Sequence, residues 1–78
     1  EVVGEPHWVG REGEHLQLVL RQGREARQTV GFGMGALRDE PDLFRGRVDI
    51  AYTPRVESWE GAERVKLELL ALRPTEKP

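Results

Sequence analysis

The stretch GFGMGA, residues 31–36, is the segment of this chain whose residue types most suggest chemistry. It satisfies the dinucleotide-binding pattern G-x-G-x-x-G/A, and Asp49 lies near the acidic position expected about 20 residues later. Such a loop binds pyrophosphate only where a full helix begins at it and directs its N-terminus at the ligand. Pro41 prevents that helix, and no Gly-Lys-Ser/Thr follows. We therefore interpret the glycines as serving the shape of the backbone.

Other residue types that perform chemistry are few and scattered. The chain has two histidines and no cysteine, and two imidazoles with dispersed carboxylates do not make a zinc site. The acidic residues Asp39, Glu40 and Asp42 stand beside a short helical segment, where carboxylates commonly cap the helix. Ser58, the single serine, lies in a predicted turn rather than in a nucleophile elbow. We expect no catalytic site, metal site or cofactor in this chain.

The composition is that of one small globular domain. The 78 residues are 37% hydrophobic and 33% charged, which is near the lower size at which a single core stabilises a fold. Twelve basic and fourteen acidic residues give a net charge of -2, so any binding to nucleic acid must depend on a local cluster. No apolar run approaches the roughly 18 residues that cross a membrane. The lack of cysteine fits a reducing cytoplasm, where we expect a soluble protein.

Alternation of apolar and polar residues predicts strands in the first half of the chain. Residues 2–9 contain Gly4 and Pro6, which is typical of an edge or bulged strand. Residues 15–22 and 26–34 predict a hairpin with a tight turn at Gly23. The inward side chains of that hairpin would be Leu16, Leu18, Leu20, Val30, Phe32 and Met34. The outward residues of its second strand would be Thr29, Gly31 and Gly33.

The second half of the chain adds one short helical segment and two more strands. Pro41 limits the helical segment, residues 36–46, to a short turn. Residues 47–56 predict a fourth strand, with Val48, Ile50 and Tyr52 inward. Residues 63–73 predict a fifth strand, although Leu70 and Leu72 also permit a helix. Five strands with one helical turn between the third and fourth predict an all-β, Greek-key OB-fold barrel over residues 1–74, with residues 75–78 as a tail or linker.

Trp59 is the aromatic residue that the predicted core does not explain. It lies between the fourth and fifth strands, in a loop that flanks the oligonucleotide face of an OB-fold. Nucleobases stack on exposed aromatic rings for about 1–3 kcal/mol each, but the ring could also fold back over the end of the barrel. The basic residues that we expect to accompany it in a nucleic-acid site are Arg11, Arg21, Arg24, Arg27, Arg55 and Lys66. Interleaved glutamates partly cancel these charges, so a solvated face is the alternative.

Three stretches resemble the OB-fold domain of RecJ, the bacterial exonuclease specific for single-stranded DNA. They are VGREGEHLQLVLRQG, GFGMG and RVDIAYTPRVESWEGAERVKLELLALRP, which together span about Trp8 to Pro74. The resemblance implies an accessory module that guides single-stranded DNA to a 5′-to-3′ nuclease core acting in DNA repair and recombination. The Asp-His-His motif of that core is absent from this chain, so the implied divalent metal, Mn or Mg, belongs to other domains. The family's NEWNG is ESWEG here, which adds negative charge beside Trp59.

We therefore expect an OB-fold module that binds single-stranded DNA weakly, with little sequence preference, and that is no enzyme by itself. Its expected partners are single-stranded DNA and the catalytic domains of a parent nuclease, without a membrane. The alternative is a protein-protein or interdomain docking module, with Leu70 and Leu72 in an exposed apolar patch. The net charge favours docking, whereas the hairpin arginines favour DNA.

Overall fold

The computed structural model describes residues 1–76, which form five strands and two short 3-10 turns. The elements are β1 (Val2–Val9), β2 (His15–Gln22), β3 (Glu25–Gly31), η1 (Gly35–Asp39), η2 (Pro41–Phe44), β4 (Val48–Trp59) and β5 (Ala62–Pro74). No helix in this part of the chain is long and apolar enough to cross a membrane. Of the predicted tail, Thr75 donates a backbone hydrogen bond to the carbonyl of Arg47 over 2.9 Å. Residues 77–78 lie outside the described residues.

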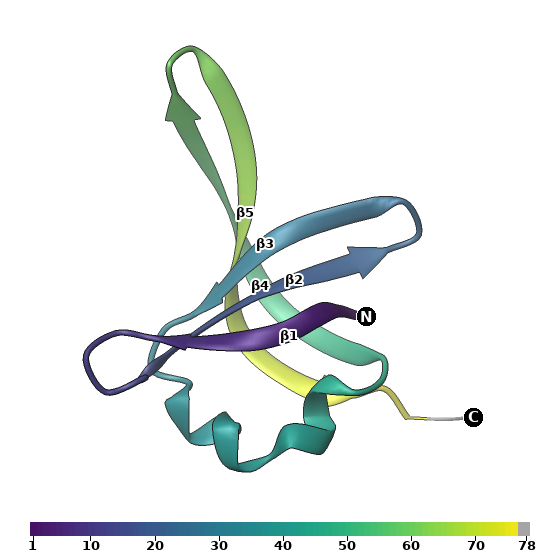
Figure 1. Cartoon of the computed structure of the whole chain (residues 1–78). Coiled ribbons are helices and arrows are strands. Elements are labelled where there is room, and N and C mark those ends of the chain that lie inside the picture. The colour runs from purple at the N-terminus through teal and green to yellow at the C-terminus, as the bar shows by residue number, and fades with distance from the viewer. Residues whose placement is uncertain (77–78) are drawn as a thin grey trace.

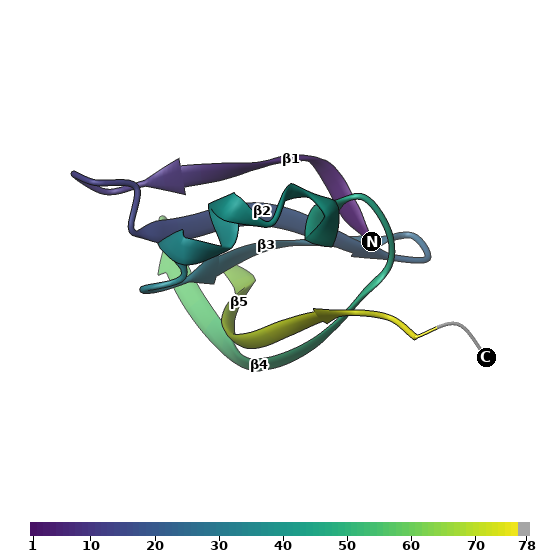
Figure 2. The same cartoon turned by 90° about the horizontal axis from the view of Figure 1, so that it is seen from below.

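The strands form one sheet in the order β1-β2-β3-β5-β4, which confirms the predicted all-β, OB-like fold (Figure 1). Neighbouring strands are antiparallel, except that β3 and β5 run parallel over two register pairs. The sheet is not closed into a full barrel, because β1 and β4 stand at the two ends of the order and do not pair. The second 3-10 turn, η2, packs against β1 (Figure 2). The rings of Trp8 and Phe44 meet there edge to face, with their centroids 5.8 Å apart.

The core lies on the inner face of the curved sheet and follows the alternation of β2. Leu16, Leu18 and Leu20 are all buried, as their period of two predicts, and Leu16 is 0% exposed. Phe44 from η2 and Leu69 from β5 complete the buried cluster. Because antiparallel partners share a face, this row of leucines also decides which residues of β1 and β3 point inward.

The predicted phase of β3 is wrong at Thr29, Gly31 and Phe32, although Val30 is buried and Met34 packs against the core as expected. Leu18 faces Thr29 and Leu16 faces Gly31, so Thr29 and Gly31 lie on the inner face, and Thr29 is buried. Phe32, which was expected in the core, is 55% exposed and packs its ring edge to face on His15. The cause is the register of the β2–β3 hairpin, which pairs Gln22 with Glu25 across a two-residue turn and thereby overrides the apolar pattern.

The β4–β5 hairpin extends beyond the core as a two-stranded arm, visible at the top of Figure 1. Tyr52 faces the same side as Ile50, as predicted, but it is 48% exposed because β4 leaves the core at that point. The turn is shorter than the predicted one and consists of Glu60 and Gly61. Trp59 is therefore the last residue of β4 rather than a loop residue.

The glycines of residues 31–36 fit the conformation and packing of the chain's own backbone. A Cβ on Gly31 would lie 2.6 Å from the sulfur of Met34, and Gly33 has a φ of +70°. Gly35 lies against the β1–β2 loop, and its N–H donates to the carbonyl of Glu14 over 3.0 Å. The predicted helical segment is two 3-10 turns. Neither has the expected side-chain cap, and Asp42 instead pairs with Arg45 at 3.0 Å.

We expect Gly35→Ala to destabilise the domain by about 1–3 kcal/mol, because overpacked sites force backbone shifts. The new Cβ would lie 2.7 Å from the carbonyl oxygen of Gly13 and 2.8 Å from the Cα of Glu14, and neither backbone atom can rotate away. Gly46→Ala is the matched control, because its Cβ would meet no atom within 4 Å. Urea denaturation of both variants measures the difference, and equal midpoints would contradict this account of the glycine.

Candidate nucleic-acid interface

The tip of the β4–β5 arm presents Trp59 to solvent. Its side chain is 76% exposed, so it does not fold back over the end of the sheet. Glu60 and Gly61 have φ values of 49° and 81°, and two positive φ angles are what a type I′ hairpin turn requires. Because the turn is tight, regular strand pairing continues to its last pair, Trp59 with Ala62. The indole therefore lies at the end of a regular strand.

The register of the arm brings three of the predicted site residues onto one face. The facing pairs are Trp59 with Ala62, Glu57 with Arg64, and Arg55 with Lys66. Because paired residues share a face and alternate residues return to it, Trp59, Arg55 and Lys66 lie on the same side of the arm. Arg64 joins them and was not among the residues predicted from the sequence. The Glu-Gly pair in the sequence could have predicted the position of Arg64, because a two-residue turn at that pair fixes the register of the hairpin.

This side of the arm is continuous with the outer face of the remaining sheet. Thr29 pairs with Leu67 on the inner face, so Gln28 and Lys66, the preceding residues, both face outward. Gln28 in turn faces Val19 of β2. We call the outer-facing residues of the arm together with those of β1, β2 and β3 the outer face.

The cations of the arm differ in how they are neutralised. Arg55 pairs with Glu68 of β5 at 3.1 Å, across the ladder. Arg64 and Lys66 have no carboxylate oxygen within 4.0 Å among the described residues. An exposed ion pair stabilises a protein by only about 0–1 kcal/mol, so a phosphate can compete with Glu68 for Arg55.

The arginines of the β2–β3 hairpin are not brought together with the arm residues by any described contact. Arg21 donates to the carboxylate of Glu1, and this hydrogen bond lowers the pKa of the Glu1 carboxyl. Arg27 stands opposite Leu20, on the side of the inner face, and pairs with Glu25 at 3.4 Å. Arg24 occupies the turn at the tip of this hairpin.

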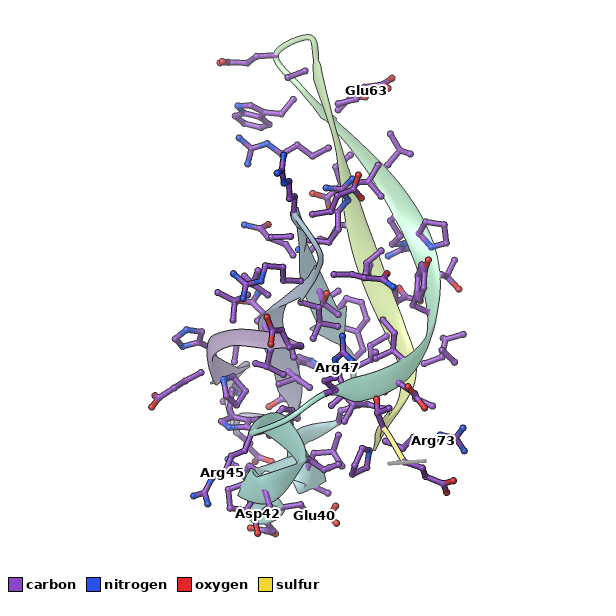
Figure 3. The ribbon with its side chains drawn as sticks, turned by 90° about the vertical axis from the view of Figure 1, so that its right-hand side faces the viewer. Glu40, Asp42, Arg45, Arg47, Glu63 and Arg73 are labelled. Carbon is purple, nitrogen blue, oxygen red and sulfur yellow. The ribbon has the colours of Figure 1, made fainter. Side chains whose placement is uncertain are left out.

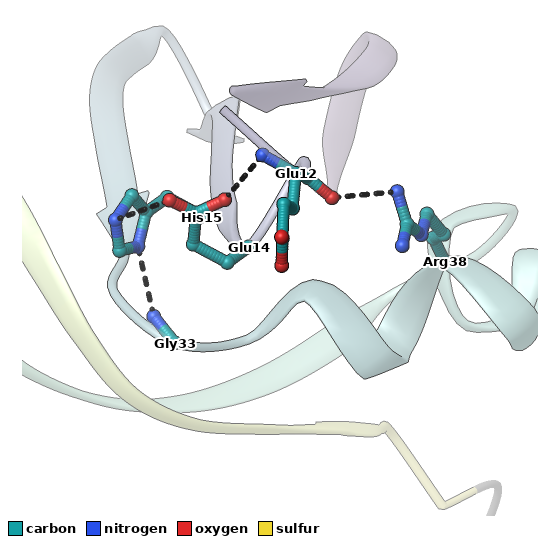
Figure 4. Close-up of polar contacts among 5 residues, drawn as sticks. All are labelled: Glu12, Glu14, His15, Gly33 and Arg38. Carbon is teal, nitrogen blue, oxygen red and sulfur yellow. Dashed lines mark hydrogen bonds and ion pairs between the residues drawn. The ribbon is translucent and has the colours of Figure 1, made fainter. Parts of the chain in front are cut away.

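Arg11 lies in the β1–β2 loop, away from the β4–β5 turn (Figure 1). That loop is ordered by Glu14, whose carboxylate accepts the Glu12 N–H over 2.8 Å (Figure 4). Hydrogen bonds from the backbone N–H groups of Glu14 and Glu12 lower the pKa of the Glu14 carboxyl. Arg38 of η1 donates to the Glu12 carbonyl over 3.3 Å and ties the loop to the 3-10 turns. Local hydrogen bonds therefore account for the conformation of this loop.

The described residues contain no group of three or more His, Cys, Asp and Glu side chains that could hold a metal ion. His15 is engaged locally, because its Nδ1 accepts the Gly33 N–H over 3.0 Å and its Nε2 lies 3.6 Å from Glu14 (Figure 4). The acidic residues near η2 lie at the opposite end of the molecule from Glu63, beside the tip of the arm (Figure 3).

Comparison with known proteins identifies the family of this chain. A family model described as the RecJ OB domain matches residues 1–71, which is most of the chain. No curated protein and no solved structure matches the chain significantly. The match covers β1 to β4 completely and β5 up to Ala71. Together with the strand order and the two 3-10 turns between β3 and β4, it shows that the chain belongs to the RecJ OB-domain family.

Proposed function

We propose that this chain is the accessory module of a RecJ-like 5′-to-3′ nuclease and that it binds single-stranded DNA along the outer face. The module guides the strand toward a catalytic core that lies in other domains, which also carry the divalent metal. The observation that supports this proposal is an exposed tryptophan on the same face of one hairpin as three cations.

Stacking and charge pairing have separate parts in this proposal. Trp59 stacks a base, and an exposed indole accepts any base because every base has a π-face. Arg55, Arg64 and Lys66 contact phosphates, which positions the strand without reading its sequence. Because the net charge is -2, affinity depends on this local cluster and is weak and salt-sensitive.

Removal of arm cations is expected to flatten the salt dependence of binding. For a single strand, the slope of log K against log salt is about -0.7 per phosphate contact, so Arg55→Ala combined with Lys66→Ala should reduce its magnitude by roughly 1.4. Arg45→Ala is the control, because Arg45 lies near η2, far from the arm (Figure 3). Anisotropy titrations of a labelled oligonucleotide at several salt concentrations measure the slopes. An unchanged slope in the double variant would remove these two cations from the interface.

A docking function is the second candidate, and the inner side of the arm favours it. Val56 faces Val65 across the ladder, both side chains are exposed, and Tyr52 lies on the same side. Leu70, at the β-bulge of β5, is also exposed, whereas Leu72 packs against the core. Val56→Asp would abolish docking of an apolar partner and leave DNA affinity intact. A loss of DNA affinity in this variant would instead place DNA on the inner side.

A further inference from the structure

The outer face contains a groove where β1 separates from β2. The β1–β2 register passes from Val3 opposite Val19 to His7 opposite Gln17, so three residues of β1 stand opposite the single residue Leu18. Such a bulge disrupts the ladder locally and leaves β1 without regular pairing there. Gly4, inside the bulge, has a φ of +71° and no atom within 4 Å of where its Cβ would be. The opening is therefore built into the backbone.

The groove has a volume of about 310 Å³, at the lower end of the range for small-ligand sites. Register places its outward side chains in one surface, because His7 faces Gln17, and Val19 faces both Val3 and Gln28. Lys66 of β5 lines the groove as well and also belongs to the cation cluster of the arm. Lys66 therefore links this opening to the cations of the arm.

We propose, on the basis of the DNA-binding function above, that this groove receives one nucleobase turned out of the bound single strand. Gln17 and Gln28 hydrogen-bond its edge, Val3 and Val19 contact its ring, and Lys66 holds the neighbouring phosphate. Trp59 stacks a different base of the same strand, toward the tip of the arm.

The chemistry of the lining suits a base better than a phosphate. A carboxamide offers one acceptor and two donors, and rotation about its last bond exchanges them, so two glutamines can pair with any base edge. Lys66 is the only side chain with a permanent positive charge in the described lining, and Glu5 contributes to the same lining. A phosphate seated in the groove would be opposed by that glutamate. The groove therefore binds any of the bases, which agrees with a weak sequence preference.

The glutamine side-chain amides provide a direct readout. The chain contains three glutamines, Gln17, Gln22 and Gln28, and no asparagine, so its NMR spectrum has three side-chain amide pairs. Gln22 is the internal control, because it lies outside the groove, next to the β2–β3 turn. The chain is titrated with (dT)8 and, separately, with an abasic strand of the same length. Each titration continues until the backbone amides of Arg55 and Lys66 stop moving.

We expect the amide pairs of Gln17 and Gln28 to shift with (dT)8 and to stay in place with the abasic strand. Gln17→Ala combined with Gln28→Ala should weaken (dT)8 binding about threefold to tenfold, with the quenching of Trp59 unchanged at saturation. Two results would contradict base binding in the groove without contradicting DNA binding by the arm. One is an equal shift of the glutamine side-chain signals with both strands, and the other is glutamine signals that stay in place after the backbone amide signals of the arm have reached saturation. If the backbone amide signals of the arm did not move with (dT)8, both the base-binding groove and the DNA-binding function would be contradicted.

Discussion

Trp59→Ala is expected to weaken binding of single-stranded DNA by about 5- to 150-fold, which corresponds to the 1–3 kcal/mol of one stacked base. The side chain is 76% exposed at the end of β4, and its removal costs the fold little because it contacts no core residue of the buried cluster. A change in affinity can therefore be assigned to the lost stacking surface. Anisotropy of a labelled oligonucleotide at low salt measures it, and Trp59→Phe should recover part of the affinity.

Tyr52→Ala is the matched control for this result. Tyr52 is another exposed aromatic residue of the same hairpin, but it lies on the inner side of the arm with Val56 and Val65. We expect its removal to leave DNA affinity within about twofold of the original, because surface substitutions outside an interface usually have effects below about 0.5 kcal/mol. If Tyr52→Ala weakened binding as much as Trp59→Ala, the outer face would not be the interface.

Leu16→Ala should cost about 2–5 kcal/mol of folding free energy, the largest stability effect that we expect in this chain. Leu16 is completely buried and is paired with Trp8 of β1 on one side and Gly31 of β3 on the other. The cavity left by the substitution cannot be filled from Gly31, which has no side chain. A domain of this size has a stability of roughly 4–12 kcal/mol, so the variant would lose a large fraction of it. Urea denaturation followed by circular dichroism provides the measurement.

Leu70→Ala serves as the comparison, because Leu70 is a leucine of β5 that is 58% exposed at the bulge opposite Ala51 and Tyr52. Its truncation leaves no buried cavity, and the free energy of unfolding should change by about 0.5 kcal/mol or less. If Leu70→Ala lost as much free energy of unfolding as Leu16→Ala, the Leu70 side chain would be packed rather than exposed, and the assignment of the core to the Leu16 cluster would be contradicted.

The period-two alternation of β2 predicted the core correctly because a half-buried strand cannot shift by one residue without exposing its leucines. The same pattern failed at the end of β3, where Phe32 looked like a core residue but lies just beyond the strand. The two-residue turn set the hairpin register, and this placed the small residues Thr29 and Gly31 on the inner face. Apolar alternation alone therefore does not determine orientation where a glycine-rich segment follows a tight turn.

The sequence predicted part of the candidate site, namely Trp59, but not Arg64 or the groove. Trp59 stood out because a large aromatic in a polar stretch has no core to enter, and the structure shows it exposed. Arg64 was missed because its place on the outer face depends on the register set by the Glu60–Gly61 turn, and the longer loop expected between the fourth and fifth strands left that register undefined. The groove beside Lys66 could not be foreseen, because it arises from a bulge that places three residues of β1 opposite Leu18. Gly4 and Pro6 indicated an irregular strand but not its geometry.

The indole N–H signals of the two tryptophans test the central claim most directly. Trp59 is at the exposed end of β4, whereas Trp8 packs against Phe44 and the core. When single-stranded DNA is added to the labelled chain at low salt, we predict that the Trp59 signal moves progressively to saturation and that the Trp8 signal stays in place. An unmoved Trp59 signal at a DNA concentration that saturates binding, or no binding at low salt, would contradict a DNA interface on the outer face.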